Sequence, residues 1–211
     1  MKIHSKTISA PMASIGKIIY EKLDPNYYLA GGTALALLLG HRKSIDLDYF
    51  INSPIDTEQL KQKLDEIFSP SKVEIIFQEK NTLWAKIDGV KISFITRPTP
   101  LLEPIMNKEN FRLAQFKDIT AMKLSAICGR DEYKDYFDLA CLTSVTDVRS
   151  WISWWQELFP NSDPMSWIVA LSAVDQIHVV PIDVQSDFAS TDTIKIIKKS
   201  EKEIIRFIRG V

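Results

Sequence analysis

Two aspartates stand one residue apart in the apolar segment SIDLDYFI. If this segment is a strand, Asp46 and Asp48 project from one face, because residues i and i+2 of a strand share a face. Ile45, Leu47 and Tyr49 then point the other way. Carboxylates this close repel each other unless a cation lies between them, and Mg²⁺ prefers such oxygen ligands together with substrate phosphates. The alternative is a turn capped by one aspartate beside a second, solvated one.

A glycine pair lies upstream, where the segment YYLA runs into a leucine-rich run. At a strand-to-helix junction, Gly31 and Gly32 would let the backbone approach a ligand closely and point the first helical N–H groups at it. Thr33 adds a hydroxyl where a helix cap or a phosphate contact would lie, and Ser44 is expected to border the same site through its position two residues before Asp46. A site for a nucleoside triphosphate needs N–H groups that bind the phosphates and carboxylates that hold the accompanying metal ion. This segment offers both in sequence.

The elements that must position these residues are predicted from hydrophobic periodicity. Helical spacing indicates helices at 13–23, 33–40 and 56–68. Besides the short strand in YYLA, four segments alternate or are rich in β-branched and aromatic residues and predict strands: 44–51, 72–78, 82–88 and 90–96. The dipeptide Asp88-Gly89 predicts a hairpin between the last two strands.

The proline-rich segment RPTPLLEP interrupts this pattern, and the chain beyond it is predicted to be mainly helical. The predicted helices lie at 117–128, 131–142, 150–158, 164–175 and 192–209. We therefore expect an α+β fold, with a mixed sheet and flanking helices in residues 1–100 and a mainly helical domain in residues 101–211.

Composition narrows the function classes. Hydrophobic residues make up 45% and charged residues 25%, which is ordinary for a globular protein, and the net charge of −1 means that any basic surface must be local. Two cysteines without CxxC spacing and three scattered histidines argue against a zinc site or a disulfide framework. The sequence has no signal-peptide pattern and no apolar run long enough to span a membrane, so we expect a cytoplasmic protein.

Two stretches resemble a known family. The string GGTALALLLGHRKSIDLDYF resembles the first motif of the AbiEii/AbiGii-type nucleotidyltransferases, which are toxins of bacterial toxin–antitoxin and phage-defence systems within the polymerase-β-like superfamily. The stretch DITAMKLSAICGRDEYKDYFDLACL, at 118–142, is similar to the family's downstream helical motif. The resemblance implies a nucleotidyltransferase-like sheet, with Gly31, Gly32 and Thr33 as the phosphate loop. It also implies Asp46 and Asp48 as Mg²⁺ ligands and a helical domain that completes the active site.

In the second motif, the resemblance assigns Lys123 to the triphosphate, as a point charge, and matches Asp138 and less directly Asp135 to the motif's acid. Asp131 shares a helix face with these two aspartates by its spacing. The alternatives are a surface lysine and a solvated acidic face. One departure concerns Ser93, which stands where the superfamily usually has a third carboxylate that serves as the base. Asp138 then supplies the base, the proton leaves to water, or the chemistry is impaired.

The resemblance implies an Mg²⁺-dependent enzyme that transfers a nucleoside monophosphate from an NTP to an acceptor hydroxyl. The acceptor would be RNA, such as tRNA, and the protein would be a toxin with an antitoxin as its partner. A second interpretation changes the acceptor to a small molecule, as in antibiotic nucleotidyltransferases. A third is a catalytically degenerate nucleotidyltransferase fold that acts as a binding module, which Ser93 prompts.

The C-terminal segment TIKIIKKSEKEIIRFIRG predicts an amphipathic helix. Its basic residues recur at steps of four and three and would form one stripe: Lys195, Lys199, Lys202, Arg206 and Arg209. A neighbouring apolar stripe is expected to dock onto the protein: Ile194, Ile197, Ile204 or Ile205, and Ile208. The basic stripe is either a solvated face or a surface that follows an RNA backbone through salt-sensitive phosphate contacts.

Overall fold

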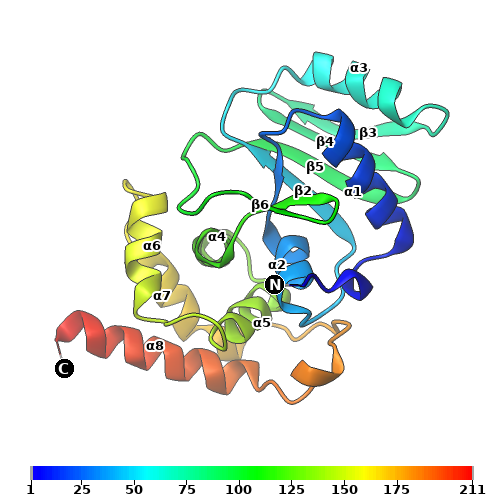
Figure 1. Ribbon diagram of the computed structural model, residues 1–211. Helices are drawn as coiled ribbons and strands as arrows, with labels where there is room; N and C mark the ends of the chain where they lie inside the picture. The colour runs from blue at the N-terminus through cyan, green and yellow to red at the C-terminus, as the bar shows by residue number, and fades with distance from the viewer. Residues whose placement is uncertain (1, 211) are drawn as a thin grey trace. The chain divides into compact units, whose positions relative to one another are not determined.

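The computed structural model describes residues 2–210 as two compact units, of which the first ends at Ala114 and the second begins at Gln115. The first unit is a mixed sheet with helices and the second is helical, which confirms the expected α+β class (Figure 1). No helix within residues 2–210 is long and apolar enough to cross a membrane.

The first unit is built on a seven-stranded sheet in the order β3-β4-β5-β2-β1-β7-β6. The strands are β1 (Tyr28–Leu29), β2 (Asp46–Ile51), β3 (Val73–Glu79), β4 (Thr82–Ile87), β5 (Val90–Thr96), β6 (Met106–Lys108) and β7 (Phe111–Leu113). β2 pairs in parallel with β5, β1 pairs in parallel with β7, and the other neighbours are antiparallel. The strand that carries the aspartate pair therefore lies at the centre of the sheet.

Three helices accompany the sheet: α1 (Ala10–Lys22), α2 (Gly31–Leu39) and α3 (Thr57–Phe68). Asp56 caps α3 by accepting hydrogen bonds from two backbone N–H groups of the first turn, at 3.1 and 3.0 Å. α3 packs on β3 and β4 and contacts α1, which in turn packs on β7. These two helices cover the face of the sheet where the buried side chains gather, among them Leu47, Leu83 and Phe94.

The strands β6 and β7 were not predicted. Each has three residues, which is too short to show alternation, and they lie after the prolines in a stretch for which no strand or helix was predicted, within the domain expected to be mainly helical. Leu113 pairs with Leu29, so β6 and β7 extend the sheet, and the first compact unit includes them and runs to Ala114.

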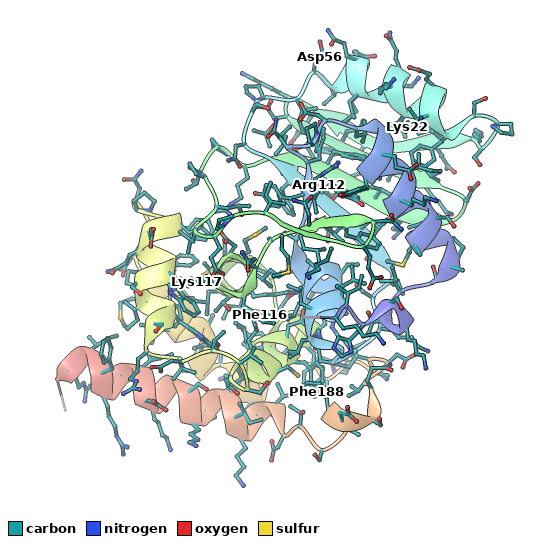
Figure 2. All side chains as sticks on the ribbon, in the orientation of Figure 1. Lys22, Asp56, Arg112, Phe116, Lys117 and Phe188 are labelled. Atoms are coloured by element: carbon teal, nitrogen blue, oxygen red, sulfur yellow. The ribbon has the colours of Figure 1, made fainter. Side chains whose placement is uncertain are left out.

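Arg112 fixes the unpredicted hairpin to α1 (Figure 2). Its buried guanidinium donates hydrogen bonds to the carbonyl oxygens of Ile19 and Tyr20 at the end of α1, and of Asp24 and Tyr27 just beyond it, at 2.8–3.3 Å. A cation at a helix C-terminus satisfies carbonyl groups that have no intrahelical partner.

The second unit contains five helices: α4 (Phe116–Gly129), α5 (Tyr133–Leu142), α6 (Ser150–Leu158), α7 (Met165–Ser172) and α8 (Thr193–Arg209). All five were predicted, although α7 ends earlier than expected and is followed by a short 3₁₀ helix, Val174–Gln176. Trp151, Trp155 and Trp167 are buried in its core, and the last two meet edge to face at 6.4 Å.

Candidate active site

The aspartate pair lies on β2 as its alternation predicts. Asp46 and Asp48 are half-buried, whereas Leu47 and Tyr49 between and after them are buried in the core. The two carboxylates therefore share the face opposite the core. Ile45 was expected on the core side and this was wrong: it precedes the strand and is 77% exposed.

Gly31 brings the start of α2 against the second aspartate. Its φ is +65°, a conformation that side chains rarely adopt, and a Cβ there would lie 3.4 Å from Oδ2 of Asp48. The backbone N–H of Ala30 donates to the carbonyl oxygen of Asp48 at 3.0 Å, which fixes the junction to β2. Ala30 is the N-cap of α2, and its methyl side chain cannot accept a hydrogen bond from the first helical N–H groups. The helix therefore presents backbone donors close to a carboxylate, an arrangement that suits a phosphate bound through a cation.

Thr33 and Ser44 connect α2 to the start of β2. The buried Thr33 hydroxyl donates to the carbonyl oxygen of Asp46 and lies 2.7 Å from Oγ of Ser44. A hydroxyl has one proton, so Ser44 is the donor in the second contact. The Thr33 side chain thus positions the strand, and phosphate binding by this residue stays a prediction for its backbone N–H. Ser44 lies just outside β2 and supports the site through Thr33.

Ser93 lies directly opposite Asp48 in the parallel pair of β5 and β2. Its hydroxyl donates to Oδ1 of Asp48 at 2.6 Å. The residue that replaces the expected third acid therefore orients one oxygen of the carboxylate, while Oδ2 lies on the side of α2. Where a carboxylate binds a metal, a hydrogen bond of this kind fixes the orientation of the carboxylate.

The residues present fit Mg²⁺. Two carboxylates on one strand face, one of them oriented by a hydroxyl, are hard oxygen donors, and Mg²⁺ usually binds one or two such groups plus substrate phosphates. Within residues 2–210, no three or more His, Cys, Asp or Glu side chains gather around one metal position. The remaining ligands would therefore come from a bound nucleotide and water.

The second unit brings together the residues of the downstream motif. Nζ of Lys123, on α4, lies 2.6 Å from Oδ1 of Asp135 and 2.5 Å from Oδ2 of Asp138, both on α5. Both aspartates are fully buried and the lysine is 4% exposed. The alternatives of a surface lysine and of a solvated acidic face are therefore wrong for these three residues. Asp131 is exposed and precedes α5, so it does not belong to the cluster.

Arg130 completes this cluster and was not assigned a role from the sequence. Its Nε and Nη2 donate to the two oxygens of Asp135 at 2.8 and 3.2 Å. Burial alone would raise the pKa of the Asp135 carboxyl, but the Lys123 ammonium and the Arg130 guanidinium outweigh it and hold that pKa below its usual value. The arginine and aspartate in the string GRDEYKD were the available signal.

The basic stripe of α8 is exposed as predicted. None of its five residues has an acidic side chain within 4.0 Å among residues 2–210. The apolar stripe is only half correct. Ile197 and Ile204 are buried, but Ile194 and Ile208 are 38% and 51% exposed, because the buried line runs through Thr193, Ile197, Ser200 and Ile204.

Known proteins share both the sequence pattern and the fold. Residues 17–151 match the family model "Nucleotidyl transferase AbiEii toxin, Type IV TA system". The uncharacterized Aquifex aeolicus protein aq_aa25 is 38% identical over 130 residues, which are 60% of this chain and 62% of that protein. The match thus spans less than two thirds of this relative's length.

Two solved structures are similar over nearly the whole chain. JHP933 from Helicobacter pylori has a TM-score of 0.51 and 18% identity, and the match covers 98% of this chain and 94% of that one. MenT4, a nucleotidyltransferase toxin from Mycobacterium tuberculosis, has a TM-score of 0.52 and 13% identity, covering 94% and 82%. At these identities the likeness shows the fold. The family match, which covers more than half of the chain, shows that the protein belongs to the AbiEii family of nucleotidyltransferase toxins.

Proposed function

We propose that this protein is an Mg²⁺-dependent enzyme that transfers a nucleoside monophosphate from an NTP to a hydroxyl of an RNA acceptor, tRNA included, and releases pyrophosphate. The observation that carries the proposal is the approach of the α2 N-terminus to Asp48 at Gly31, beside Asp46 on the same strand face. A family of toxins from type IV toxin–antitoxin systems also implies an antitoxin as a further partner.

Each residue of the first unit has a role in this proposal. The backbone N–H groups of Gly31, Gly32 and Thr33 bind the β- and γ-phosphates. Asp46 and Asp48 would hold Mg²⁺, which when bound would neutralise charge on the transferred phosphoryl group and the leaving pyrophosphate. The Ser93 hydroxyl fixes the orientation of the Asp48 carboxylate, which would hold the metal.

The downstream motif has a different part. We propose that Lys123 contributes positive charge to the triphosphate and that Asp135 and Asp138 fix its ammonium group. A carboxylate that lies 2.5 Å from an ammonium is stabilised in its ionised form and is a weak base. The proton of the acceptor hydroxyl therefore leaves to water, and Asp138 does not act as the base.

An RNA acceptor is supported by the exposed basic stripe of α8. Its five cations have no acidic partner within residues 2–210, so they supply the local positive charge that a protein of net charge −1 needs to bind a polyanion. A small antibiotic-like acceptor would not need a basic stripe that spans most of a 17-residue helix.

The test supplies α- or γ-radiolabelled NTPs with Mg²⁺ and one of three acceptors: total RNA, purified tRNA or an aminoglycoside. The expected result is α-label on RNA, no γ-label on RNA and no label on the aminoglycoside. Asp46→Asn and Asp48→Asn should lose the transfer, whereas Asp65→Asn, at an exposed ion pair on α3, should keep it. Label on the aminoglycoside alone, or γ-label on RNA, would overturn the proposal.

A further inference from the structure

Two exposed aromatic side chains lie in line with the metal-binding strand. Asp48 of β2 pairs with Ser93 of β5, which pairs with Trp84 of β4, which pairs with Phe77 of β3. Directly paired residues project from the same face of a sheet. Trp84 therefore lies on the face of the carboxylates, two strands and about 10 Å from Asp48 along the sheet.

A bulge in β3 turns Phe77 onto this face. The register of β3 and β4 shifts between Ile75 and Phe77. Without the shift, Phe77 would share the core face with Ile75, because residues i and i+2 of a strand project together. Bulges are known to redirect side chains in this way. The result is a pair of rings with centroids 5.0 Å apart and planes inclined by 46°, in which Phe77 is 39% and Trp84 is 45% exposed.

Two lysines lie beside the aromatic pair on the same face, in the row of paired residues that contains Asp46. Lys86 of β4 pairs with Lys91 of β5, which pairs with Asp46 of β2. Both lysines are exposed, and among residues 2–210 no acidic side chain lies within 4.0 Å of either ammonium. Glu74 of β3 pairs with Lys86 of β4 and places a carboxylate at the other end of this row from Asp46.

We propose that Phe77, Trp84, Lys86 and Lys91 form an aromatic platform that binds the single-stranded end of the acceptor RNA. Unpaired bases stack on exposed aromatic rings, and lysines beside the rings meet the backbone phosphates, which is the usual chemistry of single-strand binding. An RNA end on this platform has its terminal hydroxyl directed along the row toward Asp48. The proposal rests on the proposed function, since it places the acceptor of that reaction.

Binding is measured by fluorescence anisotropy of a labelled oligouridylate without NTP. Trp84→Ala should weaken binding by about 5- to 100-fold, the loss expected for one base–aromatic stack. Trp84→Phe keeps a stacking ring and should lose less. Ile76→Ala is the matched control, because Ile76 is an exposed apolar residue at the bulge that cannot stack; its affinity should equal that of the wild type.

Two further readouts separate stacking from a structural effect. Trp84 is the one tryptophan of the first 114 residues, so RNA should quench a part of the emission that Trp84→Phe no longer has. The Lys86→Gln/Lys91→Gln variant should lower the dependence of log K on log salt by about 1.4, from two phosphate contacts at about 0.7 each. Lys22→Gln, at the end of α1 (Figure 2), should leave it unchanged.

The platform and the proposed function fail in different ways. If wild-type protein transfers no nucleotide to any RNA, the proposed function fails. If RNA is labelled equally by wild type, Trp84→Ala and Ile76→Ala, the reaction stands and the platform is wrong. The platform would also be wrong if the protein bound single-stranded and duplex RNA with equal affinity. It would be wrong as well if Trp84→Ala bound RNA like the wild type but no longer bound a protein that the wild type binds.

Discussion

Replacing Lys123 with methionine removes the one ammonium that lies within 2.6 Å of both buried carboxylates on α5. Methionine keeps most of the apolar stem, so packing changes little. Asp135 retains the guanidinium of Arg130, whereas Asp138 loses the ammonium that lies 2.5 Å from its Oδ2. Breaking a buried ion pair by removing one partner costs about 3–5 kcal/mol of stability. At about 2 kcal/mol per molar urea, the unfolding midpoint of the second unit should fall by about 1.5–2.5 M.

The pH dependence sharpens this prediction. In the wild type the pKa of Asp135 is lowered in the folded state, so its contribution is complete above the usual value of 3.8 and is lost as the pH falls through the lower folded-state pKa. In Lys123→Met, the largest influence that lowers the pKa of Asp135 is lost, so burial shifts the folded-state pKa of this carboxyl upward. The folded variant then takes up protons that the unfolded chain does not, and its stability deficit should shrink as the pH falls from 7 toward 5.

The assay is urea unfolding followed by tryptophan fluorescence in a Trp84→Phe background, because the other four tryptophans all lie in the second unit. Lys198→Met is the matched control: its ammonium contacts the exposed Asp175 at 3.0 Å, and such a pair contributes less than about 1 kcal/mol. A Lys123→Met deficit no larger than that of the control, or one that does not change with pH, would show that Lys123 does not stabilise the buried carboxylates of α5. The transferase activity of Lys123→Met is informative only at conditions under which this variant is folded.

Three further predictions concern Ser93, Arg112 and the basic stripe of α8. Ser93→Ala removes the 2.6 Å hydrogen bond to Asp48, the proposed metal ligand, and should weaken Mg²⁺ activation of transfer about 10- to 100-fold, measured by metal titration; an unchanged titration would contradict this role. Arg112→Met leaves carbonyl groups at the end of α1 without their buried donor and should destabilise the first unit by about 2–3 kcal/mol in urea unfolding; a loss below about 0.5 kcal/mol would show that water replaces it. Changing Lys199, Lys202 and Arg206 together to Glu should weaken RNA binding and flatten its salt dependence while NTP binding survives; unchanged RNA affinity would leave the stripe a solvated surface.

The sequence predicted the structure best in long segments where hydrophobic residues recur with a single helical or strand period. The alternation of residues 46–51 correctly placed Asp46 and Asp48 on a common face, and the apolar spacing in the second half correctly predicted all five helices. The hairpin at Asp88-Gly89 was also correct, since turn residues with positive φ are a local signal. Ile208 was misplaced because exposure at the end of a helix depends on what it packs against.

Other features depend on pairing partners that are distant in the chain. The strands β6 and β7 exist because they add to β1, and three residues carry no period of their own. The partner of Ser93 required the parallel register of β2 and β5. The bulge that exposes Phe77 reverses the face which simple alternation assigns to it, so the aromatic pair beside the carboxylates was not visible in the sequence.

Asp46 and Asp48 are proposed to be essential for nucleotidyl transfer to RNA. The most direct test compares wild type with the Asp46→Asn/Asp48→Asn variant, whose fold is checked by circular dichroism, in one reaction with α-radiolabelled NTPs, Mg²⁺ and total RNA. The wild type is expected to yield labelled RNA and an equal molar amount of pyrophosphate, and the variant neither product. Equal labelling by the folded variant, or pyrophosphate release by the wild type without labelled RNA, would contradict the proposal.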